Sequence, residues 1–86
     1  MDINNLIAIV KKKLVEEIVL DKIEIEDKSF LHKKHKGFQE GKFHLKLMIT
    51  SEELMKLNPI ESNKKIYRIL NEEMKEYIHS LQILIN

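Results

Sequence analysis

The chain has 86 residues, a formal net charge of +1 and no cysteine. This length suits a single domain covering residues 1–86, and the lack of cysteine excludes disulfide frameworks, thiol nucleophiles and thiolate metal sites supplied by the chain alone. Charged residues of both signs make up 34% of the chain, and all basic residues but one are lysine, which argues against a strongly basic nucleic-acid binder.

The sequence also bears on where the protein works. No apolar run reaches the roughly 20 residues that a bilayer span requires. The first residues, Met1 to Asn5, are acidic and lack the basic start of a signal or transit peptide. We therefore expect a cytoplasmic protein without a membrane partner.

The first third of the chain predicts a helix followed by a strand. Asp2 stands where it can cap a helix, and apolar residues then recur every three or four positions, at Ile3, Leu6, Ile7, Val10, Leu14 and Ile18. The run Lys11-Lys12-Lys13 lies outside this stripe and is predicted to be a solvated face. From Asp21 to Lys28 the period becomes two, because Ile23 and Ile25 alternate with charged residues, which predicts a half-buried strand.

A segment without periodicity separates this strand from the next one. Residues 29–41 contain both glycines and two of the four histidines, and loops of this length in small domains are often functional. Residues 42–50 alternate again and predict a second strand. Its apolar face consists of Phe43, Leu45, Leu47 and Ile49.

The last third predicts two helices and a closing strand. Thr50 to Glu53 form a capping box, so a short helix should cover about 51–57. Asn58 and Pro59 mark the start of a longer helix that extends to about Tyr77. Its outer face is predicted to be charged, with Lys64, Lys65, Arg68, Glu72, Glu73, Lys75 and Glu76. Residues 80–85 then alternate as a final strand.

The element order is therefore α-β-β-α-α-β. The first two strands should pair as antiparallel neighbours, and the crossover through two helices should return the last strand parallel, with a right-handed connection. These rules predict an α+β two-layer sandwich, in which a three-stranded mixed sheet carries the helices on one face.

Motifs for catalysis are missing, so we expect a protein that is not an enzyme. His32 and His35, three residues apart, have the ligand type for a shared metal. Two ligands do not complete a site, and solvated loop histidines are the alternative reading. His44 is predicted to be an outward or hydrogen-bonded structural residue, and His79 to complement the end of the last helix.

Three segments, taken in order, resemble the BolA family. They are Asp27-x-Ser29-x-x-His32, the strand and helix start from Phe43 to Ser51, and the stretch that contains Tyr67-x-x-Leu70-x-Glu72-Glu73-Met74 and Ile78-His79-Ser80-Leu81. The resemblance covers residues from about 3 to 85. It implies an αββααβ fold related to type II KH domains.

The resemblance also implies a function. BolA proteins partner monothiol glutaredoxins and help to hold or deliver a [2Fe-2S] cluster, and some bacterial members are described as DNA-binding transcriptional regulators of morphology and stress response. For this chain it implies a cluster shared with a glutaredoxin and glutathione, with none bound by the chain alone. The chain is then a monomer by itself and a heterodimer with its partner, active in cluster trafficking or in iron and redox signalling.

The family's cluster ligands carry over only in part. The loop ligand falls on His32, whereas the family's second histidine, near the start of the long helix, falls on Asn63. An amide is a poor ligand for cluster iron, which takes thiolate or imidazole. Three readings follow: His35 replaces the missing ligand, His32 ligates alone, or the protein contacts glutaredoxin without ligating iron.

The competing prediction is a KH-like DNA-binding regulator. In this reading Lys56, Lys64, Lys65 and Arg68, with Asn63 beside them, contact phosphates or a partner. Against it, a KH clamp needs a glycine-bearing loop between its helices, and the junction from Lys56 to Pro59 has none. An interaction module that binds neither cluster nor DNA is a third reading.

Overall fold

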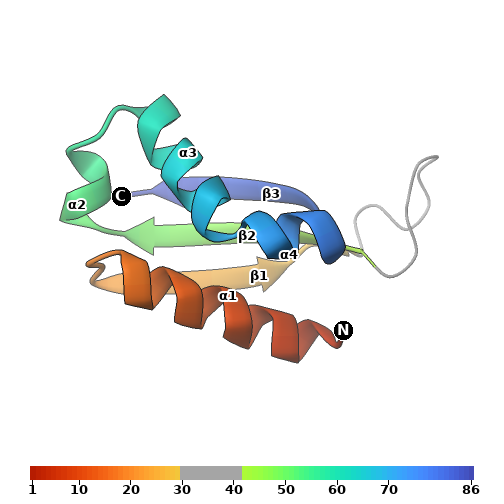
Figure 1. The fold of residues 1–86 in the computed structure, drawn as a ribbon. Coiled ribbons are helices and arrows are strands. Elements are labelled where there is room, and N and C mark those ends of the chain that lie inside the picture. Colours follow the sequence, from red (N-terminus) through yellow and green to blue (C-terminus); the bar gives the residue numbers. More distant parts are fainter. Residues whose placement is uncertain (30–41) are drawn as a thin grey trace.

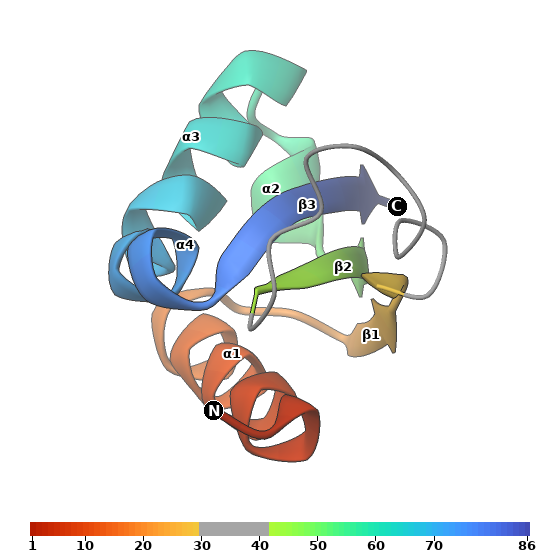
Figure 2. The same ribbon diagram turned by 90° about the vertical axis from the view of Figure 1, so that its right-hand side faces the viewer.

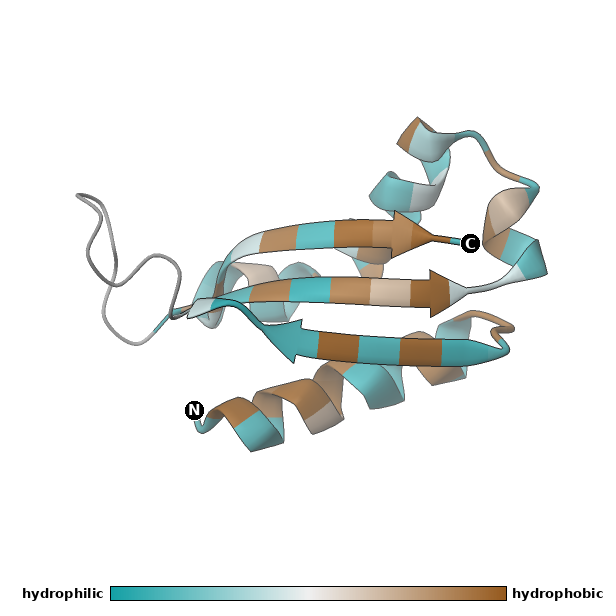
Figure 3. Cartoon of the chain, turned by 180° about the vertical axis from the view of Figure 1, so that it is seen from behind, coloured by the Kyte–Doolittle hydropathy of each residue, from teal (hydrophilic) through white to brown (hydrophobic). Residues whose placement is uncertain are grey.

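The computed structural model describes residues 1–29 and 42–86. Three strands form one sheet, and all four helices lie on the same side of it (Figures 1 and 2). Seen from behind, the strands lie in front of the helices (Figure 3), so that no helix of residues 1–29 and 42–86 covers the other side of the sheet. This arrangement confirms the predicted two-layer α+β sandwich. The elements are α1 (Ile3–Glu17), β1 (Lys22–Asp27), β2 (Phe43–Thr50), α2 (Glu52–Met55), α3 (Pro59–Ile69), α4 (Asn71–Glu76) and β3 (Ile78–Ile85).

The strand order is β1-β2-β3, with β2 in the centre. β1 pairs antiparallel with β2, and β3 pairs parallel with β2. Leu47 stands in the middle of the sheet, opposite Ile25 on one side and Ile83 on the other. The mixed sheet predicted from the connections is therefore confirmed, and β1 and β3 are its two edges.

The core lies between the sheet and the helices and consists of aliphatic side chains. The stripe predicted for the first helix supplies four of them, and the predicted apolar face of the second strand supplies three. The buried hydrophobic residues are Leu6, Val10, Leu14, Ile18, Leu45, Leu47, Ile49, Leu54, Ile66, Leu70 and Ile78.

The helix caps predicted at Asp2 and Asn58 are confirmed, and the short helix after β2 is capped by Ser51, one residue later than the capping box from Thr50 to Glu53 predicts. The side chain of Asp2 accepts a hydrogen bond from the backbone N–H of Asn4 at 3.0 Å. Ser51 accepts one from Leu54 at 3.2 Å, and Asn58 accepts one from Glu61 at 2.8 Å. Each satisfies a backbone donor that the first turn of a helix leaves unpaired.

The long helix predicted up to Tyr77 is interrupted at Leu70. There the backbone adopts φ −96° and ψ 19°, so that α3 ends before this residue and α4 begins after it. The Leu70 N–H donates to the Ile66 carbonyl at 3.0 Å, and the Leu70 carbonyl accepts from Met74 at 2.8 Å. The bend thus keeps the backbone bonded and the Leu70 side chain fully buried. The four-residue spacing of Ile66, Leu70 and Met74 continues across it, which is why the pattern predicted one helix.

Two predictions about exposed charges were wrong. The Nζ of Lys13 lies 2.8 Å and 3.0 Å from the two carboxylate oxygens of Glu73, and Glu73 is only 5% exposed. Lys13 also lies 3.6 Å from Glu72. After the bend at Leu70, α4 runs close enough to α1 for this contact. The ion pair therefore joins the first helix to the last one, whereas Lys11 and Lys12 are exposed as predicted.

The last strand begins at Ile78, two residues earlier than predicted. His79 therefore belongs to β3. Within the described ranges, none of the helices combines the length and the apolar character that a membrane crossing requires.

Candidate functional site

One end of the sheet gathers the residues that flank positions 30–41. Asp27, the last residue of β1, stands opposite Leu45, and Phe43, the first residue of β2, stands opposite Ile78 of β3. The end of β1 and the starts of β2 and β3 therefore lie together (Figure 1). The predicted ligands His32 and His35 fall within 30–41 and lie outside the described residues.

His44 ties the three strands together at this end. Its side chain is buried, and its Nδ1 hydrogen-bonds with the Ser80 hydroxyl on β3. Its backbone N–H donates to the Ser29 Oγ at 3.0 Å, and its carbonyl accepts from Lys28 at 2.7 Å. Ser29 in turn donates its N–H to the Asp27 carboxylate at 2.9 Å. The hydrogen-bonded structural role predicted for His44 is confirmed.

His79 presents an exposed imidazole beside this network. Its ring packs edge-on against the His44 ring, with 4.9 Å between the centroids and 68° between the planes. The His44 ring is itself fixed by its hydrogen bond with the Ser80 hydroxyl, so its contact with the His79 ring helps to fix the orientation of that ring. An exposed imidazole held in this way has the chemistry of a metal ligand or a proton carrier.

Local patterns in the sequence do not point to this pair of rings. His44 and His79 each stand at the second position of a strand, and the parallel pairing of these strands brings their first residues to the same end of the sheet. The last strand was predicted to begin at residue 80, however, so His79 lay outside it and the contact was not predicted.

Charges near this end are paired locally. The ammonium of Lys28 lies 2.7 Å from the Glu26 carboxylate, and its hydrogen bond holds the pKa of Glu26 below the ordinary value. The Lys42 ammonium donates to the Lys75 carbonyl at 3.4 Å. Across residues 1–29 and 42–86, no three histidine or carboxylate side chains gather as a metal site. A site that used His79 would therefore need ligands from elsewhere.

Asn63 lies at the opposite end of the sheet. Its Nδ2 donates to the Pro59 carbonyl at 2.7 Å, and together with Ile83 and Ile85 it lines a groove near the end of β3. The eight residues of β3 extend over roughly 25 Å at the usual rise of a strand. Asn63 therefore lies far from Ser29 and Lys42, the described residues on either side of the predicted loop ligands.

Of the four basic residues predicted to contact phosphates, three stand on α3 and Lys56 lies at the end of α2. Lys65 lies 3.4 Å from the Glu53 carboxylate. Lys56 and Lys64 are exposed, one at the end of α2 and the other on α3. Arg68 is one of the residues that line a cleft between α3 and α1.

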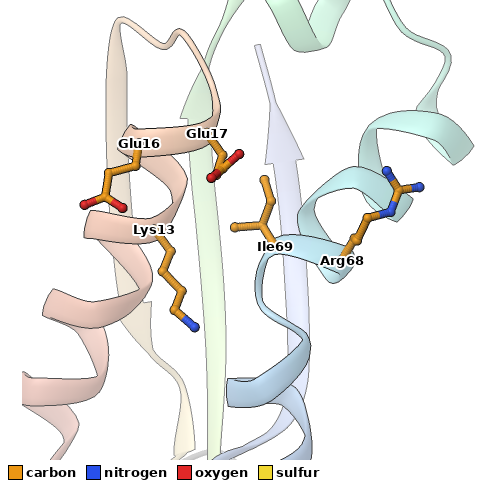
Figure 4. A pocket seen from close by; sticks show the side chains of 5 residues that line it. All are labelled: Lys13, Glu16, Glu17, Arg68 and Ile69. Atoms are coloured by element: carbon orange, nitrogen blue, oxygen red, sulfur yellow. The ribbon is translucent and has the colours of Figure 1, made fainter.

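This cleft has a volume of about 400 Å³ and separates α1 from α3 (Figure 4). Lys13, Glu16 and Glu17 line it from α1, and Arg68 and Ile69 line it from α3. The two carboxylates give the α1 wall an acidic character. The Arg68 side chain itself points away from this wall (Figure 4), and the residue is exposed.

Comparison with known proteins identifies relatives. A family model described as BolA-like protein matches residues 14–86. A protein of Haemophilus influenzae named DNA-binding transcriptional regulator BolA is 29% identical over 75 residues, which cover 87% of this chain and 70% of that protein. Protein BOLA1, chloroplastic, of Arabidopsis thaliana is 28% identical over 85 residues, and the chain spans only 53% of its length.

Solved structures agree with this result. The BolA domain of SufE1 from Arabidopsis thaliana matches with a TM-score of 0.77 and 28% identity, covering 92% of this chain and 87% of that one. BolA1 from the same plant matches with a TM-score of 0.75 and 26% identity, at the same coverage. Both solved structures are BolA domains, and the arrangement of strands and helices described above corresponds to theirs.

Proposed function

The chain belongs to the BolA-like protein family, and from this premise we propose that it partners a monothiol glutaredoxin and supplies imidazole to a shared [2Fe-2S] cluster. The observation that carries the proposal is the exposed ring of His79, packed edge-on against buried His44. It lies at the end of the sheet where the segment with His32 and His35 joins β2.

The composition supports a division of ligands between the partners. Cluster iron takes thiolate or imidazole, and the chain has no cysteine. Glutaredoxin and glutathione would therefore supply the thiolates, and this chain would supply nitrogen. The protein would be a monomer alone and a heterodimer with its partner, and cluster trafficking or iron and redox signalling would follow from that exchange.

The position of His79 relative to Ser29 favours His79 over Asn63 as the second ligand beside His32 or His35. The Ser29 hydroxyl accepts a hydrogen bond from the backbone N–H of His44, and the His44 ring contacts the His79 ring. His32 follows Ser29 by three residues, so its Cα lies at most about 11 Å away along an extended chain. Asn63 is at the far end of the sheet. We therefore propose His79 with His32 or His35 as the nitrogen ligands.

A titration of cluster-loaded glutaredoxin tests this proposal. Wild type and the variants His79→Ala, His32→Ala, His35→Ala and Asn63→His are added, and visible absorption and circular dichroism are recorded. We expect wild type to change the spectrum, His79→Ala and one of the loop variants to abolish that change, and Asn63→His to leave it intact. Gln82→Ala, which alters an exposed residue of the same strand, is the matched control.

Size-exclusion chromatography of the same mixtures separates ligation from association. If every histidine variant reproduces the wild-type spectrum, ligation by this chain is refuted. If the protein and glutaredoxin still co-elute in that case, the protein is an interaction module that binds its partner without ligating iron. If His79→Ala prevents co-elution altogether, the residue acts in docking and its assignment as a ligand fails.

A second candidate function is DNA binding, because the bacterial relative is named a DNA-binding transcriptional regulator. Lys56 and Lys64 are exposed, but Lys65 lies beside Glu53 and Arg68 shares a cleft with acidic residues. We therefore expect weak binding in a gel-shift assay that disappears at about 150 mM salt, as counterion release predicts. Binding that persists at this salt concentration would favour the regulator over the cluster partner.

A further inference from the structure

The outer edge of β3 offers backbone hydrogen-bonding groups beside a groove. The Asn86 N–H donates to the Ile49 carbonyl at 2.8 Å, and the Asn86 carbonyl accepts from Ser51 at 3.1 Å. Even-numbered residues in this half of β3 therefore point their backbone groups toward β2. Parallel pairing alternates along a strand, so the N–H and C=O groups of Ile83 and Ile85 point outward.

The groove next to these groups is aliphatic and has a volume of about 380 Å³. It runs between the end of β3 and the chain that passes from α2 into α3. Two neighbouring apolar side chains are strongly exposed, Met55 at 59% and Ile60 at 68%. The groove is lined by Leu54, Met55, Leu57, Pro59, Ser62, Asn63, Ile83 and Ile85.

The two edges of the sheet differ in how they are protected. On β1 four of the six residues are charged, a common device against pairing with another chain. On β3 no residue is Asp, Glu, Lys or Arg, and the Tyr67 hydroxyl covers part of the edge by donating to the Leu81 carbonyl at 3.2 Å. Beyond Tyr67, the edge at Ile83 and Ile85 is available as a template for a further strand.

The charge around the groove indicates the character of the occupant. Lys56 stands between two lining residues and Lys64 follows another. Both are exposed, and neither forms an ion pair within the described ranges. Of the nearby carboxylates, Glu53 lies beside Lys65 and Glu61 accepts from the Asn58 side chain, whereas Glu52 is exposed at the start of α2.

We propose that the end of β3 and this groove bind an extended peptide segment of another protein, with aliphatic side chains flanked by acidic residues. The segment pairs with the outward backbone groups of Ile83 and Ile85 and adds a fourth strand. An aliphatic side chain enters the groove, and the flanking carboxylates face Lys56 and Lys64. This proposal is independent of the cluster and uses the opposite end of the sheet.

The same features argue against two other occupants. Grooves for single-stranded nucleic acid use aromatic side chains on which bases stack, whereas every apolar residue that lines this groove is aliphatic. A second copy of the chain would need a long free edge, but Tyr67 leaves only the last part of β3 accessible. A short peptide anchored by one side chain fits both restrictions.

Fluorescence anisotropy with the full chain tests the proposal. The probe is a short labelled peptide with the sequence EDVIVIED. The controls are EDVPVPED, which lacks two backbone donors at equal charge, and KKVIVIKK, which reverses the flanking charges. We expect EDVIVIED to bind at least about tenfold more tightly than either control, because strand addition needs backbone donors and the rim is basic.

Amide hydrogen exchange by NMR locates the bound peptide. In the free protein the Ile83 and Ile85 amides should exchange faster than those of Gln82 and Leu84, and EDVIVIED should slow them at least about tenfold. Binding with no change at Ile83, or with new protection along β1, would overturn the proposal.

Two sets of variants complete the test. Lys56→Glu/Lys64→Glu should weaken binding about tenfold more than Lys11→Glu/Lys12→Glu, which makes the same change in net charge on α1. Ile83→Pro should abolish binding, because it removes an outward N–H without removing a bond to β2; far-UV circular dichroism checks that it folds. If it does not, the lysine variants and the exchange data decide.

Competition identifies the other occupants. A labelled single-stranded oligonucleotide that protects the same amides more strongly than EDVIVIED would assign the groove to nucleic acid. A dimer that forms as the protein concentration rises, with Ile83 protected before any peptide is added, would assign the edge to a second copy. Either result overturns the peptide proposal.

Discussion

Replacing Lys13 with methionine should lower the free energy of unfolding by about 3 kcal/mol, because it leaves a buried carboxylate without its cation. Glu73 is 5% exposed, and both of its carboxylate oxygens lie within 3.0 Å of the Lys13 ammonium. Methionine retains most of the apolar side chain, so the change isolates the charge. Urea denaturation followed by circular dichroism measures the loss.

The pair should respond unequally to the loss of each partner. Glu73→Gln should cost only about 1 kcal/mol, because the Lys13 side chain is 33% exposed and Glu72 lies 3.6 Å away. Lys12→Met, at the exposed neighbouring position, is the matched control and should change stability by less than about 0.5 kcal/mol. If Lys13→Met and Lys12→Met have equal effects, the contact between α1 and α4 does not stabilise the fold.

The same contact predicts a dependence on pH at the alkaline end. The hydrogen bond to Glu73 raises the pKa of Lys13 above its ordinary value of 10.5. A raised pKa in the folded state means that the contribution is complete below 10.5 and is lost as the pH rises through the raised value. The difference in unfolding free energy between wild type and Lys13→Met should therefore be constant from neutral pH up to about pH 10 and shrink above it. A difference that instead shrank at neutral pH would contradict this assignment.

Ser51→Ala should lower the free energy of unfolding by about 2 kcal/mol, because one buried hydroxyl makes two bonds. Ser51 is fully buried. Its Oγ accepts from the Leu54 N–H at 3.2 Å and donates to the Val19 carbonyl at 2.7 Å. The residue thus starts α2 and holds the connection between α1 and β1. Thermal unfolding monitored by circular dichroism measures the effect.

Asn58→Ala provides the comparison for Ser51→Ala. Asn58 caps α3 through its side chain, but it is exposed, so water can replace part of the lost bond and the cost should be about 1 kcal/mol. If the two alanine variants have equal effects, the bond to Val19 contributes nothing and Ser51 is only a helix cap.

Local patterns predicted most of the fold because the physics behind them is local. The caps at Asp2, Ser51 and Asn58 depend on residues two or three positions away. The spacing of the apolar residues indicated which face of each helix and strand is buried. The rules for strand pairing and crossover connections then predicted the mixed sheet. The interruption at Leu70 escaped this reasoning, because the apolar spacing is the same on both sides of it.

Contacts between distant residues could not be predicted in the same way. Lys13 and Glu73 are 60 positions apart, and each looks like part of a solvated charged face when its own helix is considered alone. Their burial depends on how α4 runs relative to α1. The outward direction of the backbone groups at Ile83 and Ile85 depends likewise on the pairing of β3 with β2.

The features of the candidate site also separate into those that the sequence predicts and those that depend on the tertiary structure. The sequence by itself determined the ligand chemistry, since a chain without cysteine offers cluster iron imidazole but no thiolate, and it marked residues 29–41 as the irregular segment. Only the tertiary structure decided that His79 lies beside His44, next to the flank of that segment, while Asn63 lies at the other end of the sheet. His44 and Ser80 are 36 positions apart, and two parallel strands bring them together because each begins at the same end of the sheet.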